Sequence, residues 1–265
     1  MSILDSGMVE FINQKCDNPS AFRSCGLSNK ESVVKLTVAQ LARMIDLSAV
    51  RAEVEMAEVC RLADVAKQYR CVCAFVMPCY LPELKHLLAD SPDVGIGGVV
   101  GFPSGSTSTA TKAAEARQQV AQGATELDMV INVGMLRSGR NEYVADDIRA
   151  VVEAAAGLPV KVILEAHYLS DEQIVRACGI ALHAGAAFVK TGTGWASSGA
   201  TLHNVALMKS AVGDKAQVKA AGGVRDLDTV VEMIRRGVSR FGVGLDSGIH
   251  ILQQCAALPD GSVEV

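Results

Sequence analysis

The sequence predicts an α/β protein, a single (β/α)8 TIM barrel with an N-terminal extension. Short apolar runs typical of buried strands alternate with longer amphipathic runs typical of helices, and this happens eight times at roughly 25 residues per unit. No Gly-x-Gly-x-x-Gly motif follows the first strand-like run, although that motif is common in open doubly wound sheets. A closed barrel is therefore favoured over an open sheet.

The expected strands are short and apolar, as strands that are covered on both faces should be. Pro78 stops the second strand, because proline cannot continue a central strand. In chain order the strands are expected at Met44–Leu47, Cys71–Met77, Val94–Phe102, Glu126–Asn132, Val160–Glu165, Ala187–Lys190, Gln217–Ala220 and Arg240–Val243.

The helices between these strands show apolar residues at helical spacing and have recognisable ends. Thr37 is expected to cap a short helix over Val38–Arg43, and Gly185 and Gly237 follow the ends of two later helices. The eight barrel helices are expected at Glu53–Tyr69, Leu81–Leu88, Thr109–Gly123, Glu142–Ala156, Asp171–Ala184, Leu202–Val212, Asp226–Arg236 and Ser247–Ala256.

Three segments follow from this pattern. Residues 1–40 are expected to form the N-terminal extension, residues 41–258 the barrel domain, and residues 259–265 a C-terminal tail. Turn signals such as Asn18-Pro19 dominate the extension, in which Met8–Ile12 is expected to form one or two helical turns.

The composition excludes several classes of partner. Apolar residues make up 49% of the chain and aromatic residues only 4%, which suits an aliphatic core around parallel strands. The net charge of −4 offers no basic face for nucleic acid. No apolar run is long enough to span a membrane, and no basic segment followed by an apolar one indicates a signal peptide. We therefore expect neither a nucleic-acid partner nor a membrane partner.

The eight cysteines are expected to be mostly buried free thiols. Cys71 and Cys73 are too closely spaced for the usual two-residue redox or zinc pair, and no histidine pair follows at ligand distance. In apolar surroundings a thiol packs as a small hydrophobic group. This usage fits a reducing cytoplasm, and no metal or other cofactor is expected.

Strand alternation places a set of charged side chains inside the barrel. The alternate residues of the same strands are apolar, as helix-covered barrel strands require, so the polar ones point inward. One interpretation is an ion-pair network that only fills the barrel, because buried charges are costly unless they pair. The expected inward residues are Asp46, Asp128, Lys161, Glu165, Lys190 and Lys219.

Lys190 and Lys219 favour a catalytic interpretation. Each lies near the end of an expected strand, where the catalytic residues of barrel enzymes collect, and a glycine-containing loop follows. Neighbouring strands should bring the two ammonium groups together, so that one amine is neutral near pH 7. Two such lysines beside Asp128 indicate Schiff-base chemistry.

Five runs, in this order, resemble the motifs of the deoxyribose-phosphate aldolase family, whose members are class I aldolases on a (β/α)8 barrel. Each run alone is a modest signal, but the ordered set is specific and spans roughly residues 40–255. The runs are MIDL at 44–47, VVGFP at 99–103, ELDMVIN at 126–132, FVKT at 188–191 and VKAAGGVR at 218–225.

The resemblance implies a role for each catalytic candidate. Lys190 would form an imine with the substrate carbonyl, Lys219 would lower the pKa of Lys190 through its charge, and Asp128 would join a proton relay. The family reaction is the reversible cleavage of 2-deoxyribose 5-phosphate to acetaldehyde and glyceraldehyde 3-phosphate. It needs no metal or other cofactor, because the iminium acts as the electron sink. The implied partners are therefore a small sugar phosphate and an aldehyde.

Substrate contacts are expected from strand residues and from the loops at the strand ends. Phosphate sites of barrel enzymes use the loops after the seventh and eighth strands and a helix N-terminus. The expected substrate-binding residues are Asp46, Lys161, Thr191, Thr193, Gly222, Gly223, Gly244 and Ser247.

Four positions depart from the family pattern. Gly192 stands where a serine is usual, and Trp195 stands where phenylalanine or lysine is common. The run EAH at 165–167 replaces a common Glu-Thr pair, and its histidine is expected at the surface or as a supporting residue. The loop after the eighth strand is expected to be longer than usual, with Asp246 as an outward-facing N-cap of the last helix.

These departures leave alternatives open. The same imine chemistry could act on a different sugar phosphate or on an unphosphorylated aldehyde. The barrel could also bind a sugar phosphate without catalysis, although a binding protein has no need for a lysine of depressed pKa. Homo-oligomerisation stays open as well, because no exposed apolar stripe in the sequence is distinct enough to name.

Overall fold

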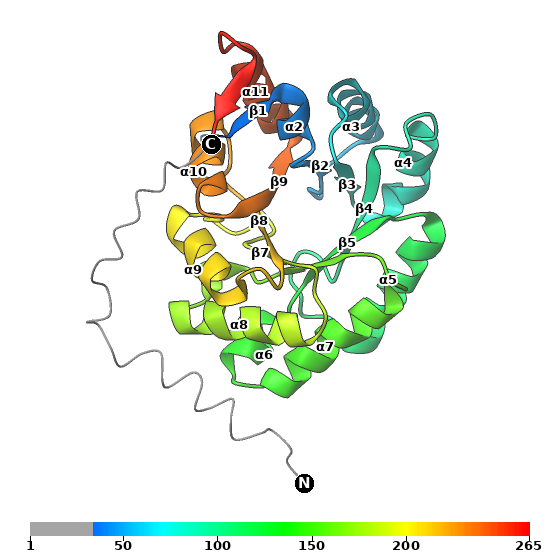
Figure 1. The fold of residues 1–265 in the computed structure, drawn as a ribbon. Coiled ribbons are helices and arrows are strands. Elements are labelled where there is room, and N and C mark those ends of the chain that lie inside the picture. Colours follow the sequence, from blue (N-terminus) through cyan, green and yellow to red (C-terminus); the bar gives the residue numbers. More distant parts are fainter. Residues whose placement is uncertain (1–33) are drawn as a thin grey trace, which may run out of the picture. The chain divides into compact units, whose positions relative to one another are not determined.

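Eight parallel strands form a closed barrel with helices around it (Figure 1). The computed structural model describes residues 34–265, and the helical turns expected over Met8–Ile12 lie outside these residues. The strands β2 to β9 follow one another around the barrel in chain order, and β9 pairs in parallel with β2 to close it. The prediction of a single closed barrel is confirmed.

All eight expected strands and all eight expected barrel helices are present, with shifts at their ends. The barrel strands are β2 (Ile45–Ala49), β3 (Cys73–Val76), β4 (Gly95–Val100), β5 (Glu126–Val130), β6 (Val160–Ile163), β7 (Phe188–Lys190), β8 (Gln217–Ala221) and β9 (Val238–Gly244). The barrel helices are α3 (Met56–Tyr69), α4 (Leu81–Leu87), α5 (Thr109–Gln122), α7 (Asn141–Ala154), α8 (Asp171–His183), α9 (Leu202–Val212), α10 (Leu227–Ile234) and α11 (Leu245–Ala256).

Local sequence explains where several helices begin. Thr37 caps α2 (Val38–Ala42) as expected, and its hydroxyl accepts a hydrogen bond from the backbone N–H of Gln40. The side chain of Gln40 in turn accepts a hydrogen bond from the backbone N–H of Thr37, which completes a capping box. Ser170 begins α8 with the same arrangement. Each cap satisfies backbone N–H groups that a helix start leaves without partners.

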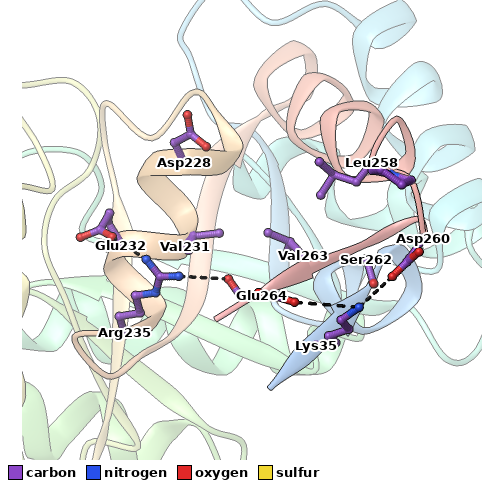
Figure 2. Close-up of a pocket in the computed structure, with 11 residues that line it drawn as sticks. Lys35, Asp228, Val231, Glu232, Arg235, Leu258, Asp260, Ser262, Val263 and Glu264 are labelled. Atoms are coloured by element: carbon purple, nitrogen blue, oxygen red, sulfur yellow. Dashed lines mark hydrogen bonds and ion pairs between the residues drawn. The ribbon is translucent and has the colours of Figure 1, made fainter. Parts of the chain in front are cut away.

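The two ends of the described chain pair with each other. β1 (Lys35–Thr37) and β10 (Ser262–Glu264) form an antiparallel ribbon that the sequence did not predict. A cavity of about 530 Å³ lies between this ribbon, α10 and the turn after α11 (Figure 2). Four of its charged side chains form two ion pairs: Lys35 lies 2.7 Å from Asp260, and Arg235 lies 2.9 Å from Glu232. The expected boundaries at residues 40 and 258 stay a prediction.

Three of the differences at the strand ends affect residues that were expected in the site or next to it. A short helix, α6 (Val133–Arg137), follows β5, and Asn132 caps it instead of ending the strand. β6 stops at Ile163, so Glu165 is not an inward-facing strand residue but precedes the 3-10 turn η2 (Ala166–Tyr168) with a left-handed φ of 52°. A second 3-10 turn, η1 (Pro78–Tyr80), begins at the proline that ends β3.

The third difference concerns the end of the barrel. β9 begins two residues before its expected start and continues to Gly244, and α11 begins at once with Leu245. The long loop expected here is therefore absent, and Gly244 rather than Asp246 is the N-cap. Aspartate is favoured both as an N-cap and within the first helical turn, so residue type alone did not fix the boundary.

The faces of the strands alternate as predicted. Leu127 and Met129 of β5 belong to the main apolar core between strands and helices, while Asp128 lies on the other face and is fully buried. Val189 and Val218 occupy the same core, opposite Lys190 and Lys219. The helices thus cover the apolar face, and the barrel interior is left for polar side chains.

A buried ion pair between two helices supports the barrel from outside. Lys112 of α5 donates hydrogen bonds to Asp147 of α7, at 2.5 Å, and to the backbone oxygen of Val130 at the end of β5, at 2.8 Å. Neither charged side chain is exposed to solvent. The pair joins two helices to the strand that carries Asp128.

Lys112→Met is expected to lower the free energy of unfolding by about 3–5 kcal/mol, because it leaves the buried carboxylate of Asp147 without its cation. Urea denaturation followed by circular dichroism measures the loss. The double variant Lys112→Met/Asp147→Leu should recover much of it, since no buried charge is then left unpaired. A single variant as stable as the wild type would contradict this assignment.

Within residues 34–265, no helix combines the length and apolar character needed to cross a membrane. Four of the six cysteines in this part of the chain are buried free thiols, as expected, and Cys79 is exposed. Burial raises the pKa of the Cys178 thiol to about 12, which keeps it protonated and unreactive.

Candidate active site

Lys190 and Lys219 lie side by side inside the barrel. Lys190 is the last residue of β7, and its register partner on β8 is Lys219. Both ammonium groups donate hydrogen bonds to the same oxygen of Asp128 on β5, at 2.7 Å and 2.6 Å. Asp128 and Lys219 are fully buried, and Lys190 is only 6% exposed. The structure thus brings the three catalytic candidates together, and their roles stay predictions.

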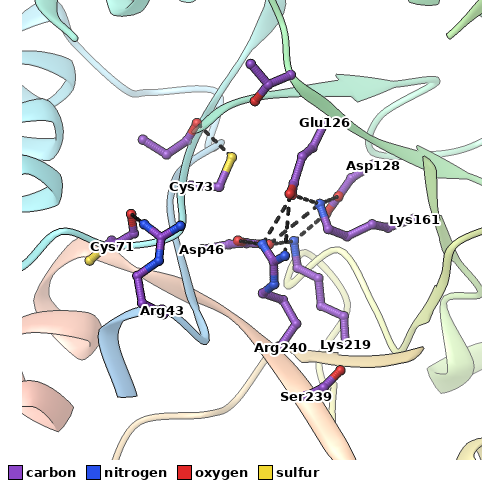
Figure 3. A network of polar contacts seen from close by, with 12 residues as sticks. Arg43, Asp46, Cys71, Cys73, Glu126, Asp128, Lys161, Lys219, Ser239 and Arg240 are labelled. Carbon is purple, nitrogen blue, oxygen red and sulfur yellow. Dashed lines mark hydrogen bonds and ion pairs between the residues drawn. The ribbon is translucent and has the colours of Figure 1, made fainter. Parts of the chain in front are cut away.

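A network of further charges adjoins Asp128 and Lys219 (Figure 3). Lys219 also pairs with Asp46 of β2, with a distance of 2.6 Å between Nζ and Oδ2. Lys161 of β6 lies 3.2 Å from the second oxygen of Asp128 and 3.8 Å from Asp46. Asp46 and Lys161, both expected to contact substrate, therefore sit in a buried ion-pair network, and no solvent reaches their side chains.

Two members of this network were missed by sequence reasoning. Arg240 of β9 lies 2.7 Å from Asp46 and 3.2 Å from Glu126 of β5, and Glu126 also accepts a hydrogen bond from Lys161. Strand alternation held the signal for Glu126, because it lies two residues before Asp128 and therefore on the same face. Arg240 shares a face with Gly242 in the same way. The strand was expected to begin at Arg240 itself, so no earlier strand residue indicated which way the side chain of Arg240 points.

An aromatic ring completes the interior. Phe75 of β3 lies with its ring centre 4.2 Å from Lys219 Nζ and 4.7 Å from Lys161 Nζ, which are cation–π distances. Gly97, the register partner of Phe75 on β4, makes room for this ring, since a Cβ there would lie 2.5 Å from ring atoms. The ring thus limits where both ammonium groups can lie.

The charges in the network decide the state of Lys190. Three carboxylates, from Asp46, Glu126 and Asp128, face four basic side chains, from Lys161, Lys190, Lys219 and Arg240. The network is neutral when one of the four basic groups gives up its proton. Buried networks favour neutrality, because an uncompensated charge in a low dielectric is costly.

Lys190 gives up its proton more easily than an ordinary lysine. Burial is the main cause that lowers its pKa, the charge of Asp128 partly opposes this, and Lys219 lowers it further, to about 8. For Lys161 burial acts in the same direction, but Asp128, Asp46 and Glu126 outweigh it and hold the pKa above the ordinary lysine value. Burial would raise the pKa of Asp128, yet the surrounding lysines lower it, so Asp128 stays ionised.

The loop after β7 is anchored at its start. Thr191 donates a hydrogen bond from its hydroxyl to the backbone oxygen of Ala221, at 2.8 Å. Thr193 donates from its hydroxyl and from its backbone N–H to the carboxylate of Glu165, at 2.5 Å and 3.2 Å. Both threonines are buried, so each acts here to hold the loop against the ends of β6 and β8.

Backbone groups surround the ends of β8 and β9. Gly222 and Gly223 have φ angles of 84° and 87°, in the left-handed region that favours glycine. A cavity of about 550 Å³ opens at the N-terminus of α11, where Gly244 and Ser247 are among its lining residues. The first N–H groups of this helix have no side-chain cap, so they remain as hydrogen-bond donors for a ligand.

Comparison with known proteins identifies the family. A family model described as DeoC/LacD family aldolase matches residues 37–254. The chain is 44% identical over 238 residues to a protein named deoxyribose-phosphate aldolase from Rhizobium meliloti (strain 1021), covering 90% of this chain and 96% of that relative. The chain belongs to the DeoC/LacD aldolase family. The family resemblance predicted from the sequence is confirmed.

Other DeoC/LacD relatives agree in sequence and in structure. A deoxyribose-phosphate aldolase from Klebsiella pneumoniae subsp. pneumoniae is 43% identical, over 87% of this chain and 94% of its own length. A solved structure of deoxyribose phosphate aldolase from Aeropyrum pernix, described as tetrameric, superposes with a TM-score of 0.77. It is 29% identical and covers 84% of this chain and 93% of its own.

Two departures from the DeoC/LacD pattern have structural explanations. A Cβ at Gly192 would lie 2.7 Å from the carboxylate oxygen Oε1 of Glu165, so glycine leaves room for the bond between Glu165 and Thr193. Asp246 lines the cavity at the N-terminus of α11, has 85% of its side chain exposed, and pairs with Arg61 of α3 at 3.0 Å. Arg61 therefore offsets its charge at the edge of this cavity, and Asp246 is not the helix cap.

The only candidate metal cluster among residues 34–265 does not suit a metal in this aldolase. Ligand atoms of Asp46, Cys73 and Glu126 lie within 4.8 Å of one another. Burial, together with Asp46 and Glu126, raises the pKa of the Cys73 thiol, so the thiolate that a metal requires is disfavoured. Arg240 already bridges the two carboxylates. A dication would add positive charge to a network in which each carboxylate already pairs with a basic side chain.

Proposed function

We propose that this chain is a class I aldolase that reversibly cleaves 2-deoxy-D-ribose 5-phosphate to acetaldehyde and D-glyceraldehyde 3-phosphate through an imine on Lys190. The observation that carries this proposal is the environment of Lys190. It is a buried strand-end amine with a pKa lowered to about 8, bonded to a carboxylate that a second lysine shares. Such an amine is partly neutral near pH 7 and can attack a carbonyl.

Imine formation is the first step of the proposed reaction. The neutral Nζ of Lys190 attacks the aldehyde carbon C1, and the resulting carbinolamine loses water to give an iminium. Asp128 is placed to move protons in this step, because its Oδ2 lies 2.7 Å from Nζ. Lys219 lies 2.6 Å from the same oxygen and can return a proton to it.

Cleavage then uses the iminium as the electron sink. A base takes the proton of the C3 hydroxyl, the C2–C3 bond breaks, and its electron pair forms an enamine on Lys190 while glyceraldehyde 3-phosphate leaves. Protonation of the enamine at C2 gives the iminium of acetaldehyde, and water releases acetaldehyde and the free lysine. No electrons enter or leave, so the residues of the chain suffice for the chemistry.

The names of the curated relatives support 2-deoxyribose 5-phosphate over another sugar phosphate or an unphosphorylated aldehyde. Its phosphate would lie near Gly222, Gly223 and the N-terminus of α11, where backbone N–H groups can donate to an anion. Asp246 lines the same cavity, but its ion pair with Arg61 offsets the negative charge that would otherwise repel the phosphate. A barrel that binds without catalysis is not favoured, because it would have no use for the lowered pKa of Lys190.

The decisive experiment is a borohydride trap. Incubation with acetaldehyde and sodium borohydride should add one ethyl group, and peptide mapping should locate it on Lys190. Turnover of 2-deoxyribose 5-phosphate, measured against 2-deoxyribose and ribose 5-phosphate, tests the substrate. A wild-type protein without the adduct contradicts the imine, and equal turnover of 2-deoxyribose contradicts the phosphate site.

The pH dependence of kcat/KM should report the pKa of Lys190. Below about pH 8 the amine is protonated, so we expect kcat/KM to rise as the pH increases and to level off above that value. Lys219→Met should move the rising limb of this pH profile to higher pH, because it removes a positive charge that lowers the pKa of Lys190. A limb that stays in place, or moves down, would contradict the proposed role of Lys219.

Two further properties remain proposals. A tetrameric relative and the frequency of symmetric assemblies support a homo-oligomer, which light scattering during size-exclusion chromatography can test. A monomer across the micromolar range would reject it. A cytoplasmic location is supported by the free buried thiols, since oxidising compartments favour disulfides.

A further inference from the structure

Trp195, the only tryptophan in the sequence, reaches across the mouth of the barrel. It belongs to the loop after β7, yet its indole N–H donates a hydrogen bond to the backbone oxygen of Val50, after β2, at 3.0 Å. Its ring also meets the edge of Phe102, after β4, with ring centres 6.1 Å apart and planes at 85°. Two strands separate β7 from β4, and two others separate it from β2. A ring that touches all three loops must lie over the barrel opening.

The residues that Trp195 touches pack against the interior of the barrel. Val50 and Phe102 pack against the interior cluster of Cys73, Phe75 and Val99, and the ring of Phe75 faces the ammonium of Lys219. Lys190 itself is only 6% exposed. An aldehyde has to reach Nζ of Lys190 for an imine to form, so some of the residues over the barrel opening must move.

The backbone on either side of Trp195 is tied down. Thr193 is bonded to Glu165, as described above, and Ser198 bonds to His167 with 2.6 Å between the hydroxyl and Nδ1. Both anchors lie in the segment after β6. The indole is held more weakly, by one hydrogen bond, one aromatic contact and the guanidinium of Arg51, which lies 5.5 Å from the ring centre.

These contacts are weak enough to open repeatedly. A single hydrogen bond and a single aromatic pair each contribute only modestly in water, because the groups can instead contact solvent. Gly194, which precedes the tryptophan, has a φ of 81° that glycine adopts freely. With 37% of its surface exposed, the ring can swing outward without disrupting the core. The anchored backbone then confines the motion to the side chain and the few residues around it.

We propose that Trp195 is the movable cover of the Lys190 site and that its ring, together with Val50 and Phe102, limits the size of the group that C2 of the enamine can carry when it joins glyceraldehyde 3-phosphate. The cover opens to admit substrate and closes over the enamine, which it shields from solvent. This inference rests on the proposed function, because it concerns access to the imine on Lys190.

The test compares aldehydes of different length. Acetaldehyde and butanal are offered with glyceraldehyde 3-phosphate, and kcat/KM for C–C bond formation is measured for wild type, Trp195→Ala and Trp195→Phe. We expect Trp195→Ala to raise the butanal-to-acetaldehyde ratio at least about tenfold, the usual effect of space for one or two methylene groups. Trp195→Phe keeps an aromatic wall and should stay within about threefold of the wild-type ratio.

Tyr168→Ala is the matched control. Tyr168 is an exposed aromatic residue of η2 whose ring meets that of His167, so its loss disturbs an anchor of the loop but not the tryptophan ring and should leave the ratio unchanged. If Trp195→Ala selects aldehydes as the wild type does, the cover is rejected. Should Trp195→Ala fold poorly by circular dichroism, Trp195→Leu replaces it, with the same expected rise and the same outcome for rejection.

The single tryptophan also gives a direct readout of the motion. Borohydride reduction with acetaldehyde fixes the adduct on Lys190, and acrylamide quenching of tryptophan fluorescence then measures the exposure of the ring. We expect quenching to fall at least about twofold in the trapped enzyme, because a closed ring is less accessible than one that opens and closes. Unchanged quenching in an enzyme that carries the adduct rejects the proposal that Trp195 is a movable cover but leaves the proposed function standing. Absence of the adduct rejects the proposed function instead.

Discussion

Replacing Lys190 with methionine is expected to reduce turnover of 2-deoxyribose 5-phosphate by at least about 10⁴-fold, since no other amine can form the covalent intermediate. Lys219 cannot substitute, because it lies 2.6 Å from both Asp46 and Asp128 and these two carboxylates hold it in the ion-pair network. Steady-state kinetics and the borohydride trap, both applied to the variant, measure the loss. Neither turnover nor the ethyl adduct should be detected.

This variant should fold as well as the wild type. Methionine matches the length of lysine without its amine, and the remaining network holds three carboxylates and three cations. A melting temperature close to that of the wild type would confirm that the loss is chemical. Lys215→Met, at an exposed position after α9, is the matched control and should keep full activity. Turnover of Lys190→Met within about tenfold of the wild type would contradict the imine mechanism.

The sequence was sufficient to predict the barrel and most of its polar interior. Alternation within β5 to β8 places Asp128, Lys161, Lys190 and Lys219 inward, and all four are buried in the interior network. Alternation depends only on the period of a strand, which the local sequence contains. The same rule applies to Glu126, but a charged residue at the first position of a strand can equally face solvent, so alternation alone did not place it inside.

The pairing of these charges could not be predicted. Asp46 and Arg240 are 194 residues apart in the chain and lie 2.7 Å apart in the barrel, because β9 closes against β2. Which cation each carboxylate receives depends on strand register and on the position of the ring of Phe75. Neither is encoded in a local pattern.

The contacts made by the loops were even harder to predict from the sequence. Trp195 stood out only as an unusual residue after Lys190, whereas its hydrogen bond to Val50 joins positions 145 residues apart. Glu165 was expected on a strand face, yet it adopts a left-handed conformation and binds Thr193. Non-glycine residues rarely adopt that conformation, so sequence rules argue against it until the tertiary contact is known.

Asp128→Asn is expected to separate two effects of the carboxylate that Lys190 and Lys219 share: proton transfer and the effect of its charge on the pKa of Lys190. The amide keeps the shape of the side chain but cannot accept a proton as a base does, so kcat should fall by about 10²–10⁴-fold. At the same time the pKa of Lys190 should fall below about 8, because the charge of Asp128 is what raises it against burial. The pH limb of kcat/KM should therefore move to lower pH while kcat falls.

This opposite movement distinguishes a proton relay from general damage. A variant that was only misfolded would lose activity without a directed shift of the limb. The free energy of unfolding should also fall by about 3–5 kcal/mol, since Lys161 and Lys219 lose a buried partner. Asp46→Asn is the matched comparison: it removes a carboxylate that pairs with Lys219 and Arg240 but does not contact Lys190. Its loss of stability should be similar and its loss of kcat at least about tenfold smaller, because the oxygen next to the reacting amine is retained.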